Sequence, residues 1–288
     1  MKVLWKGEGN QYNVFVNGTL VMVMSEEEQS TTQWYELTSS LKTTYVNHIL
    51  LTKRTEAVNN ARAEIFYQVQ VDDGGILATP PPASPRQLEF LGDSITCGYG
   101  LWSTPRQGSA CHQFSVRSED NWMTYGPVTA RHFGARVHVE SWSGKGLLKN
   151  AGDSVIPSVD PLPIYFNRTV ATQSRPLWSF DRYVPQAVII NLGTNDYSGP
   201  PYPTQEQFEE AYHQFLATIR EAYGSQTIFF LVCGPMSSAT MSCSYVSQVA
   251  SKEMNAHYVD MSAILSADDY GVSDYLFSMI CRALTGRG

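Results

Sequence analysis

Short runs of alternating apolar and polar residues, separated by turn residues, fill the first part of the chain. Residues 12–16 and 20–23 flank an Asn17-Gly18 pair. This arrangement predicts a β-hairpin, because both central residues of such a tight turn need positive φ. The acidic and glycine-rich stretch at 72–75 predicts a second turn. Three further segments have the composition of strands: residues 48–53, 64–71 and 76–77.

A proline-rich segment at 78–85, with the sequence ATPPPASP, interrupts this pattern. Prolines at this density cannot continue a central strand or a helix interior, and they favour a stiff, extended spacer. We therefore predict two domains, a β-domain at 1–83 and a larger domain at 84–288.

Beyond the proline-rich segment, continuous apolar runs alternate with helical patterns. This alternation predicts an α/β domain in which helices cover both faces of a parallel sheet. The clearest helix begins at Thr204, where Gln207 completes a capping box, and ends before Gly224. The runs expected as strands are 87–91, 136–141, 187–192, 227–232 and 257–261.

The composition and net charge of the chain exclude several classes of binding partner. Hydrophobic residues make up 43% and charged residues 16% of the chain, as in an ordinary globular protein. The net charge is −7 and no block of Lys and Arg stands out, so we expect no nucleic-acid partner and a neutral rather than an anionic ligand. No apolar run has the length that a bilayer requires, so we expect no membrane partner.

The five cysteines show neither a C-x-x-C spacing nor histidines at zinc-site intervals, so we expect no metal. Cys97 and Cys111 enclose a short loop, and a disulfide between them would contribute roughly 3 kcal/mol in a secreted protein. The alternative is two buried free thiols. Glycosylation sequons at Asn17 and Asn167 arise often by chance and add little to the question of secretion.

Three polar turns each follow a predicted parallel strand, so they meet at one edge of the sheet. Ser94 lies in GDSIT, Gly144 in SGKG and Asn195 in GTND. A serine hydroxyl can act as a nucleophile, and glycine and asparagine amides can donate to a developing oxyanion. Each turn alone also has a simpler explanation, as a helix cap or a flexible loop, and it is their convergence that favours catalysis.

These motifs, in this order, resemble the SGNH (GDSL-like) hydrolases. With KRTE at 53–56 before the proline-rich segment, the layout is similar to that of carbohydrate esterase family two over nearly the whole chain. The resemblance implies an N-terminal jelly-roll β-sandwich packed on a C-terminal α/β/α domain with a flavodoxin-like parallel sheet. It implies cofactor-free removal of O-acetyl groups from xylan and related sugars, with Ser94 as nucleophile and the Ser94 amide, Gly144 and Asn195 as the oxyanion hole. It also implies further β-sandwich and a signal peptide before Trp5.

The same resemblance places a catalytic histidine near the C-terminus, just after an aspartate. Asp274 matches this aspartate, whereas Leu276 stands at the position expected for the histidine. A leucine cannot accept a proton, and loss of the base lowers turnover in serine hydrolases by about 10⁴–10⁶-fold. We therefore expect weak or absent activity for this chain. His112, which lies nearest to Ser94 in sequence, is the alternative base, and the other histidines are expected to be structural or solvated.

Two other functions remain open beside the carbohydrate esterase. One is a catalytically silent sugar-binding protein of the same fold. The other is a lipid esterase, which needs an apolar acyl groove and is disfavoured by the β-domain and its linker. The expected partner is an acetylated oligo- or polysaccharide, and we expect a secreted monomer.

Overall fold

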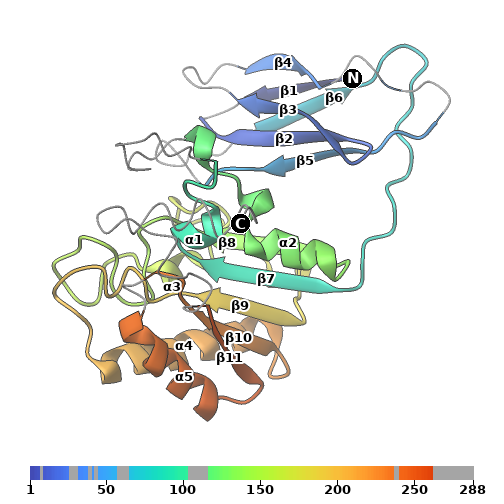
Figure 1. Cartoon of the computed structure of the whole chain (residues 1–288). Coiled ribbons are helices and arrows are strands. Elements are labelled where there is room, and N and C mark those ends of the chain that lie inside the picture. Colours follow the sequence, from blue (N-terminus) through green and yellow to red (C-terminus); the bar gives the residue numbers. More distant parts are fainter. Residues whose placement is uncertain are drawn as a thin grey trace, which may run out of the picture.

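The computed structural model describes residues 1–6, 9–25, 32–37, 41, 45–56, 65–102, 116–236 and 240–261. Two three-stranded antiparallel sheets form its N-terminal part, which Figure 1 shows stacked on the rest of the chain. The strand orders are β4-β1-β6 and β3-β2-β5. The strands are β1 (Lys2–Lys6), β2 (Gln11–Val16), β3 (Thr19–Ser25), β4 (Thr32–Glu36), β5 (Ile49–Lys53) and β6 (Ile65–Gln70).

The predicted hairpin is confirmed. Strands β2 and β3 pair antiparallel, and Asn17 and Gly18 between them have φ of 51° and 82°. The strands expected near 48–53 and 64–71 and the turn at 72–75 are also present. The strand expected at 76–77 is wrong, because these two exposed residues pair with no other strand. Strands β1 and β4 were not predicted. The two sheets share one apolar core: Val3, Trp5, Val14, Met24 and Leu37.

The C-terminal part is built on a five-stranded parallel sheet with the order β11-β10-β9-β7-β8. All five predicted strands are present, with ends that differ from the predicted ones by at most one residue. Strand β7 is flanked by β8 and β9, so the loops that follow these three strands are neighbours. The strands are β7 (Gln87–Gly92), β8 (Arg136–Ser141), β9 (Ala187–Asn191), β10 (Ile228–Cys233) and β11 (Ala256–Asp260).

Helices lie on both faces of this sheet (Figure 1). Helix α4 (Gln205–Tyr223) has the predicted capping box at Thr204 and Gln207, and its cap residue at the other end is Gly224. Its apolar face packs with α5 (Thr240–Lys252) on a core that includes Val188 and Ile190 of β9. The remaining helical segments are α1 (Ser94–Cys97), η1 (Val116–Ser118), η2 (Asn121–Met123), α2 (Tyr125–His132), α3 (Leu162–Tyr165) and η3 (Phe180–Arg182).

Buried polar contacts join the two parts of the chain. Arg54, just after β5, pairs with Asp120 at 3.5 Å and donates to the carbonyl of Glu119 at 3.2 Å. Asn13 of β2 donates to the same Asp120 carboxylate at 3.0 Å. The proline-rich segment between the two parts is exposed and has no regular structure. Both the extended segment and the polar junction therefore connect the N-terminal sheets to the α/β part.

The cysteine pairing differs from the expected one. Cys97 is a buried free thiol, so the expected bridge to Cys111 is wrong; Cys111 itself lies outside the described residues. The disulfide joins Cys233, at the end of β10, to Cys243 of α5. This pairing closes a strand-to-helix connection, which the sequence spacing alone did not indicate. None of the helices within the described ranges is long and apolar enough to cross a membrane.

Candidate active site

Ser94 occupies the first position of α1, directly after β7. Asp93 caps this short helix by accepting a hydrogen bond from the Ile95 amide at 2.9 Å. Gly92 does not have positive φ; a side chain is excluded there because a Cβ would lie 2.0 Å from Oγ1 of Thr96. This close approach explains the glycine of the motif. The Ser94 side chain is partly exposed, as an attacking nucleophile requires.

Gly144 lies in the loop after β8 and has a φ of +79°. The continuation of this loop is held by Asp196, whose buried carboxylate accepts the amides of Leu147, Leu148 and Lys149 at 2.7–2.9 Å. Burial raises the pKa of Asp196, although these three amides favour its ionised form. The aspartate that ends GTND thus fixes the loop that begins with SGKG.

Asn195 connects all three turns. Its Nδ2 donates to Oδ2 of Asp93 at 3.2 Å and to the carbonyl of Lys145 at 2.8 Å. Asp93 is the residue before Ser94, and Lys145 is the residue after Gly144. The structure therefore brings the three turns to one place, as the order of β8, β7 and β9 requires. The same contacts show that both N–H groups of this amide have partners within the protein.

Asp93 is the most perturbed acid of the three turns. It is fully buried, and burial raises its pKa to about 7. The amide of Ile95 opposes this shift, whereas the nearby carboxylates of Asp196 and Glu56 add to it. Sequence analysis singled out Ser94 and Asn195 and did not anticipate the role of the residue between Gly92 and Ser94. A carboxyl that titrates near neutral pH therefore lies beside the nucleophile.

Aromatic rings and an ion pair lie next to Gly144. Nζ of Lys145 contacts Asp160 at 2.7 Å, and the Tyr165 hydroxyl donates to the same carboxylate at 2.8 Å. The rings of Trp142 and Tyr165 lie 5.2 Å apart, and Nζ of Lys145 is 4.9 Å from the Tyr165 centroid. Burial disfavours the charge on Asp160, but its hydrogen bonds outweigh that effect and lower its pKa.

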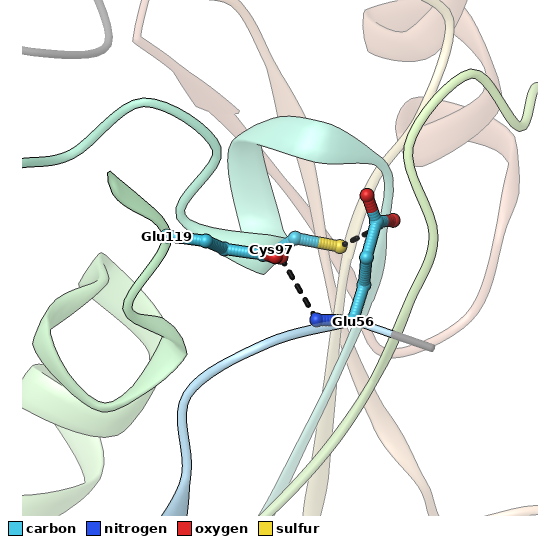
Figure 2. A group of neighbouring side chains, drawn as sticks. All are labelled: Glu56, Cys97 and Glu119. Atoms are coloured by element: carbon cyan, nitrogen blue, oxygen red, sulfur yellow. Dashed lines mark hydrogen bonds between the residues drawn. The ribbon is translucent and has the colours of Figure 1, made fainter. Parts of the chain in front are cut away.

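Two further acids approach the nucleophile helix from outside the three turns (Figure 2). Glu56 accepts the Ser143 amide at 2.5 Å and a hydrogen bond from the Cys97 thiol at 3.5 Å. Glu119 accepts the Glu56 amide at 2.9 Å. Burial raises the pKa of both carboxyls, and for Glu119 the charge of Glu56 adds to the effect. The sequence could have pointed to Glu56, because this residue ends the KRTE segment that the family resemblance uses. No sequence motif pointed to Glu119.

No histidine of the described ranges forms a hydrogen bond with Ser94. His138 and His213 instead contact acids, and His132 is exposed at the end of α2. These placements agree with the expectation that they are structural or solvated. Asp274, Leu276 and His112 lie outside the described residues. The partners are Glu89 for His138, Glu253 for His213, Phe133 for His132 and Phe230 for His257.

Residues 90–278 match the GDSL-like Lipase/Acylhydrolase family. The fold is similar to that of a family two carbohydrate esterase from Clostridium thermocellum in complex with cellohexaose. The two chains are 31% identical, and the TM-score is 0.78 over 90% of this chain and 78% of that one. The chain belongs to the GDSL-like hydrolases, within carbohydrate esterase family two. The matched range includes Asp274 and Leu276, which the structure does not describe.

Curated relatives agree with this assignment. The chain is 33% identical over 276 residues to the cellulase/esterase CelE of Acetivibrio thermocellus, with 92% of this chain and 32% of that protein covered. It is 27% identical over 180 residues to an acetylxylan esterase/glucomannan deacetylase of Cellvibrio japonicus, with 62% and 48% covered. The chain therefore spans about a third of the length of the first relative and about half of the second.

Proposed function

We propose that this chain is a carbohydrate acetyl esterase in which Ser94 is the nucleophile. Oγ of Ser94 attacks the acetyl carbonyl, and the amides of Ser94 and Gly144 with the side chain of Asn195 hold the oxyanion. The bond between the acetyl carbon and the sugar oxygen breaks, and the sugar leaves as an alcohol with the proton that Ser94 gave up. Water then hydrolyses the acetyl-serine, which releases acetic acid and restores the Ser94 hydroxyl. Because both N–H groups of Asn195 are already used, one of its hydrogen bonds exchanges for the substrate oxygen. The convergence of the three turns on Asn195 is the observation that supports this proposal.

Acetylated carbohydrate is the proposed substrate class. The partly exposed ring of Trp142 next to Gly144 offers an apolar face for a sugar ring, and Asp160, whose side chain is 44% exposed, offers a polar group. A related esterase has been crystallised with cellohexaose, and another relative is named an acetylxylan esterase/glucomannan deacetylase. A β-linked, partly acetylated polysaccharide fits these facts.

The test is acetate release from acetylated xylan oligosaccharides. Ser94→Ala removes the nucleophile, and Ser251→Ala, on the exposed side of α5, serves as the matched control. Activity that disappears in the first variant and persists in the second supports the proposal. Activity that persists in Ser94→Ala contradicts it.

A second function, sugar binding without turnover, is favoured by one specific observation. Leu276 stands where the family resemblance implies a histidine, and the described histidines have other partners. Titration calorimetry with cellohexaose separates the two functions. Binding by both the chain and Ser94→Ala, without acetate release by either, would support the binding function.

We also propose that the chain is secreted. The disulfide between Cys233 and Cys243 supports this, since such bonds persist in oxidising compartments. Detection of the protein in the culture medium of its source organism tests the proposal, and complete retention inside cells contradicts it.

A further inference from the structure

Three side chains of metal-ligand type meet at the junction between the N-terminal sheets and the nucleophile helix. They are Glu56, Cys97 and Glu119, and one potential ligand atom of each lies within 4.8 Å of the others. Figure 2 shows Glu56 and Glu119 approaching Cys97 from two sides. The three residues come from distant parts of the sequence, just after β5, from α1 and just after η1. Sequence spacing therefore could not reveal the cluster.

One ligand atom of this cluster lacks a partner. Glu119 is fully buried; its Oε1 accepts the Glu56 amide, whereas its Oε2 has no hydrogen-bond partner among the described residues. A buried carboxylate oxygen without a partner is costly unless a proton or a cation satisfies it. The buried guanidinium of Arg54 donates to the main-chain carbonyl of Glu119, and it directs its NH1 group to Asn13 and Asp120. Within the described ranges, neither Glu56 nor Glu119 forms an ion pair.

We propose that Glu56, Cys97 and Glu119 bind a divalent cation of the borderline-soft class, with Zn²⁺ as the best fit. Zinc accepts thiolate sulfur at about 2.3 Å and carboxylate oxygen at about 2.0–2.2 Å, which places tetrahedral ligands roughly 3.6 Å apart. Sγ of Cys97 and Oε2 of Glu56 are already 3.5 Å apart. No two of these ligand atoms are more than 4.8 Å apart, so binding requires a contraction of at most about 1 Å.

Binding of the ion exchanges protons for metal. The Cys97 thiol releases its proton to solvent and binds as thiolate, and any proton on the two carboxyls is released as well. The bound ion joins the N-terminal sheets, through Glu56, to α1, which begins with Ser94. Through the Glu56–Ser143 contact it also fixes the backbone next to Gly144. The proposed role is therefore structural, at the base of the candidate active site.

The experiment measures Zn²⁺ binding by calorimetry to the full chain after treatment with a chelator. We expect one equivalent, with about tenfold or greater weakening in Glu119→Gln and in Cys97→Ser. The matched control is Glu89→Gln, because Glu89 is equally buried but contacts His138 and Tyr223. Binding by this control should equal that of the unmodified chain. Zinc should also raise the melting temperature of the chain by more than that of Glu119→Gln at the same zinc concentration.

Co²⁺ gives a second readout that does not depend on esterase activity. A thiolate-to-cobalt charge-transfer band should appear in the unmodified chain and vanish in Cys97→Ser. This comparison still decides the matter if Glu119→Gln does not fold. Absence of Zn²⁺ binding overturns the proposal. A shared proton, rather than a cation, would then satisfy Oε2 of Glu119. Equal binding by Cys97→Ser, or a cobalt band that persists in it, overturns it as well.

Discussion

Asn195 donates a hydrogen bond to Oδ2 of Asp93 over 3.2 Å, although the two residues are 102 positions apart in the chain. The contact is possible because β7 and β9 are adjacent and parallel, so the turns that follow them meet. It couples the asparagine of GTND to the residue that caps the nucleophile helix. The chemistry of Ser94 therefore depends on a contact that the nucleophile itself does not make.

Replacement of Asn195 by alanine should lower both stability and function. The change removes the donor to the Lys145 carbonyl and to Oδ2 of Asp93, which costs about 1–3 kcal/mol, while Oδ1 of Asp93 keeps the Ile95 amide. It also removes an oxyanion donor, for which losses of about 10²–10³-fold in turnover are typical. Urea unfolding and acetate release measure the two effects. An Asn195→Ala variant with unchanged stability would show that the two hydrogen bonds do not contribute.

The stability of the protein should fall as the pH rises from about 4 to 7 because of Asp93. Its folded pKa of about 7 lies above its ordinary value of 3.8, so the folded state holds a proton that the unfolded state loses first. The contribution of Asp93 to the free energy of unfolding is present in full below pH 3.8. It declines between pH 3.8 and 7 and is lost above pH 7. The effect reaches at most about 4 kcal/mol.

Urea unfolding at intervals of pH measures this effect in the chain and in Asp93→Asn. The asparagine cannot ionise, so its stability curve should be flatter across the same window. Identical slopes in the two proteins would show that another group carries the pH dependence.

Arg54→Ala should destabilise the junction between the two parts strongly. The variant leaves Asp120 as an uncompensated charge whose side chain is only 3% exposed, and breaking such a buried pair costs about 3–5 kcal/mol. The control is Asp72→Ala, which breaks an ion pair with the N-terminal amine in which the Asp72 side chain is 74% exposed. This control should change stability by less than about 1 kcal/mol. If both changes lower the free energy of unfolding equally, the buried pair at the junction does not contribute more than the exposed pair, and the prediction is wrong.

Reduction of the Cys233–Cys243 disulfide should lower the melting temperature. Its ends are 10 residues apart, and closure of such a loop contributes about 3 kcal/mol through the unfolded state. Differential scanning calorimetry with and without reductant measures the shift. The double variant Cys233→Ser, Cys243→Ser should melt at the lower temperature and should not respond to reductant.

Local sequence signals predicted the elements whose structure is determined locally. The Asn17-Gly18 hairpin, the Thr204 capping box and the five apolar strands depend on neighbours in sequence, and all are confirmed. The strand predicted at 76–77 is absent, because two apolar residues without a partner strand cannot form the hydrogen bonds of a sheet. Strands β1 and β4 were missed because each is a short segment of five residues, so only their pairing in the structure identifies them.

The candidate site was predictable to the extent that parallel strands end at one edge. That rule predicts that the turns of Ser94, Gly144 and Asn195 lie together. It could not reveal that Asp93 is the partner of Asn195, or that Glu56 reaches Ser143 from another sheet. Such contacts depend on how the N-terminal sheets pack on the α/β part. The predicted bridge between Cys97 and Cys111 was wrong for a different reason, because loop length does not determine which sulfur atoms meet.

Leu276 stands at the position where the family resemblance places the catalytic base. If Leu276 replaces the base, the unmodified chain should show weak or no turnover of a chromogenic acetyl ester, because the Ser94 hydroxyl is a poor nucleophile without a proton acceptor. Leu276→His should then raise turnover, and the gain should disappear in the double variant Ser94→Ala, Leu276→His. Leu276→Gln is the matched control, since it is polar but cannot act as a base at neutral pH. Robust, Ser94-dependent turnover by the unmodified chain would contradict the prediction and show that another group accepts the proton. His112→Ala would be the next variant to measure, because a loss of that turnover would identify the imidazole nearest to Ser94 in sequence as the base.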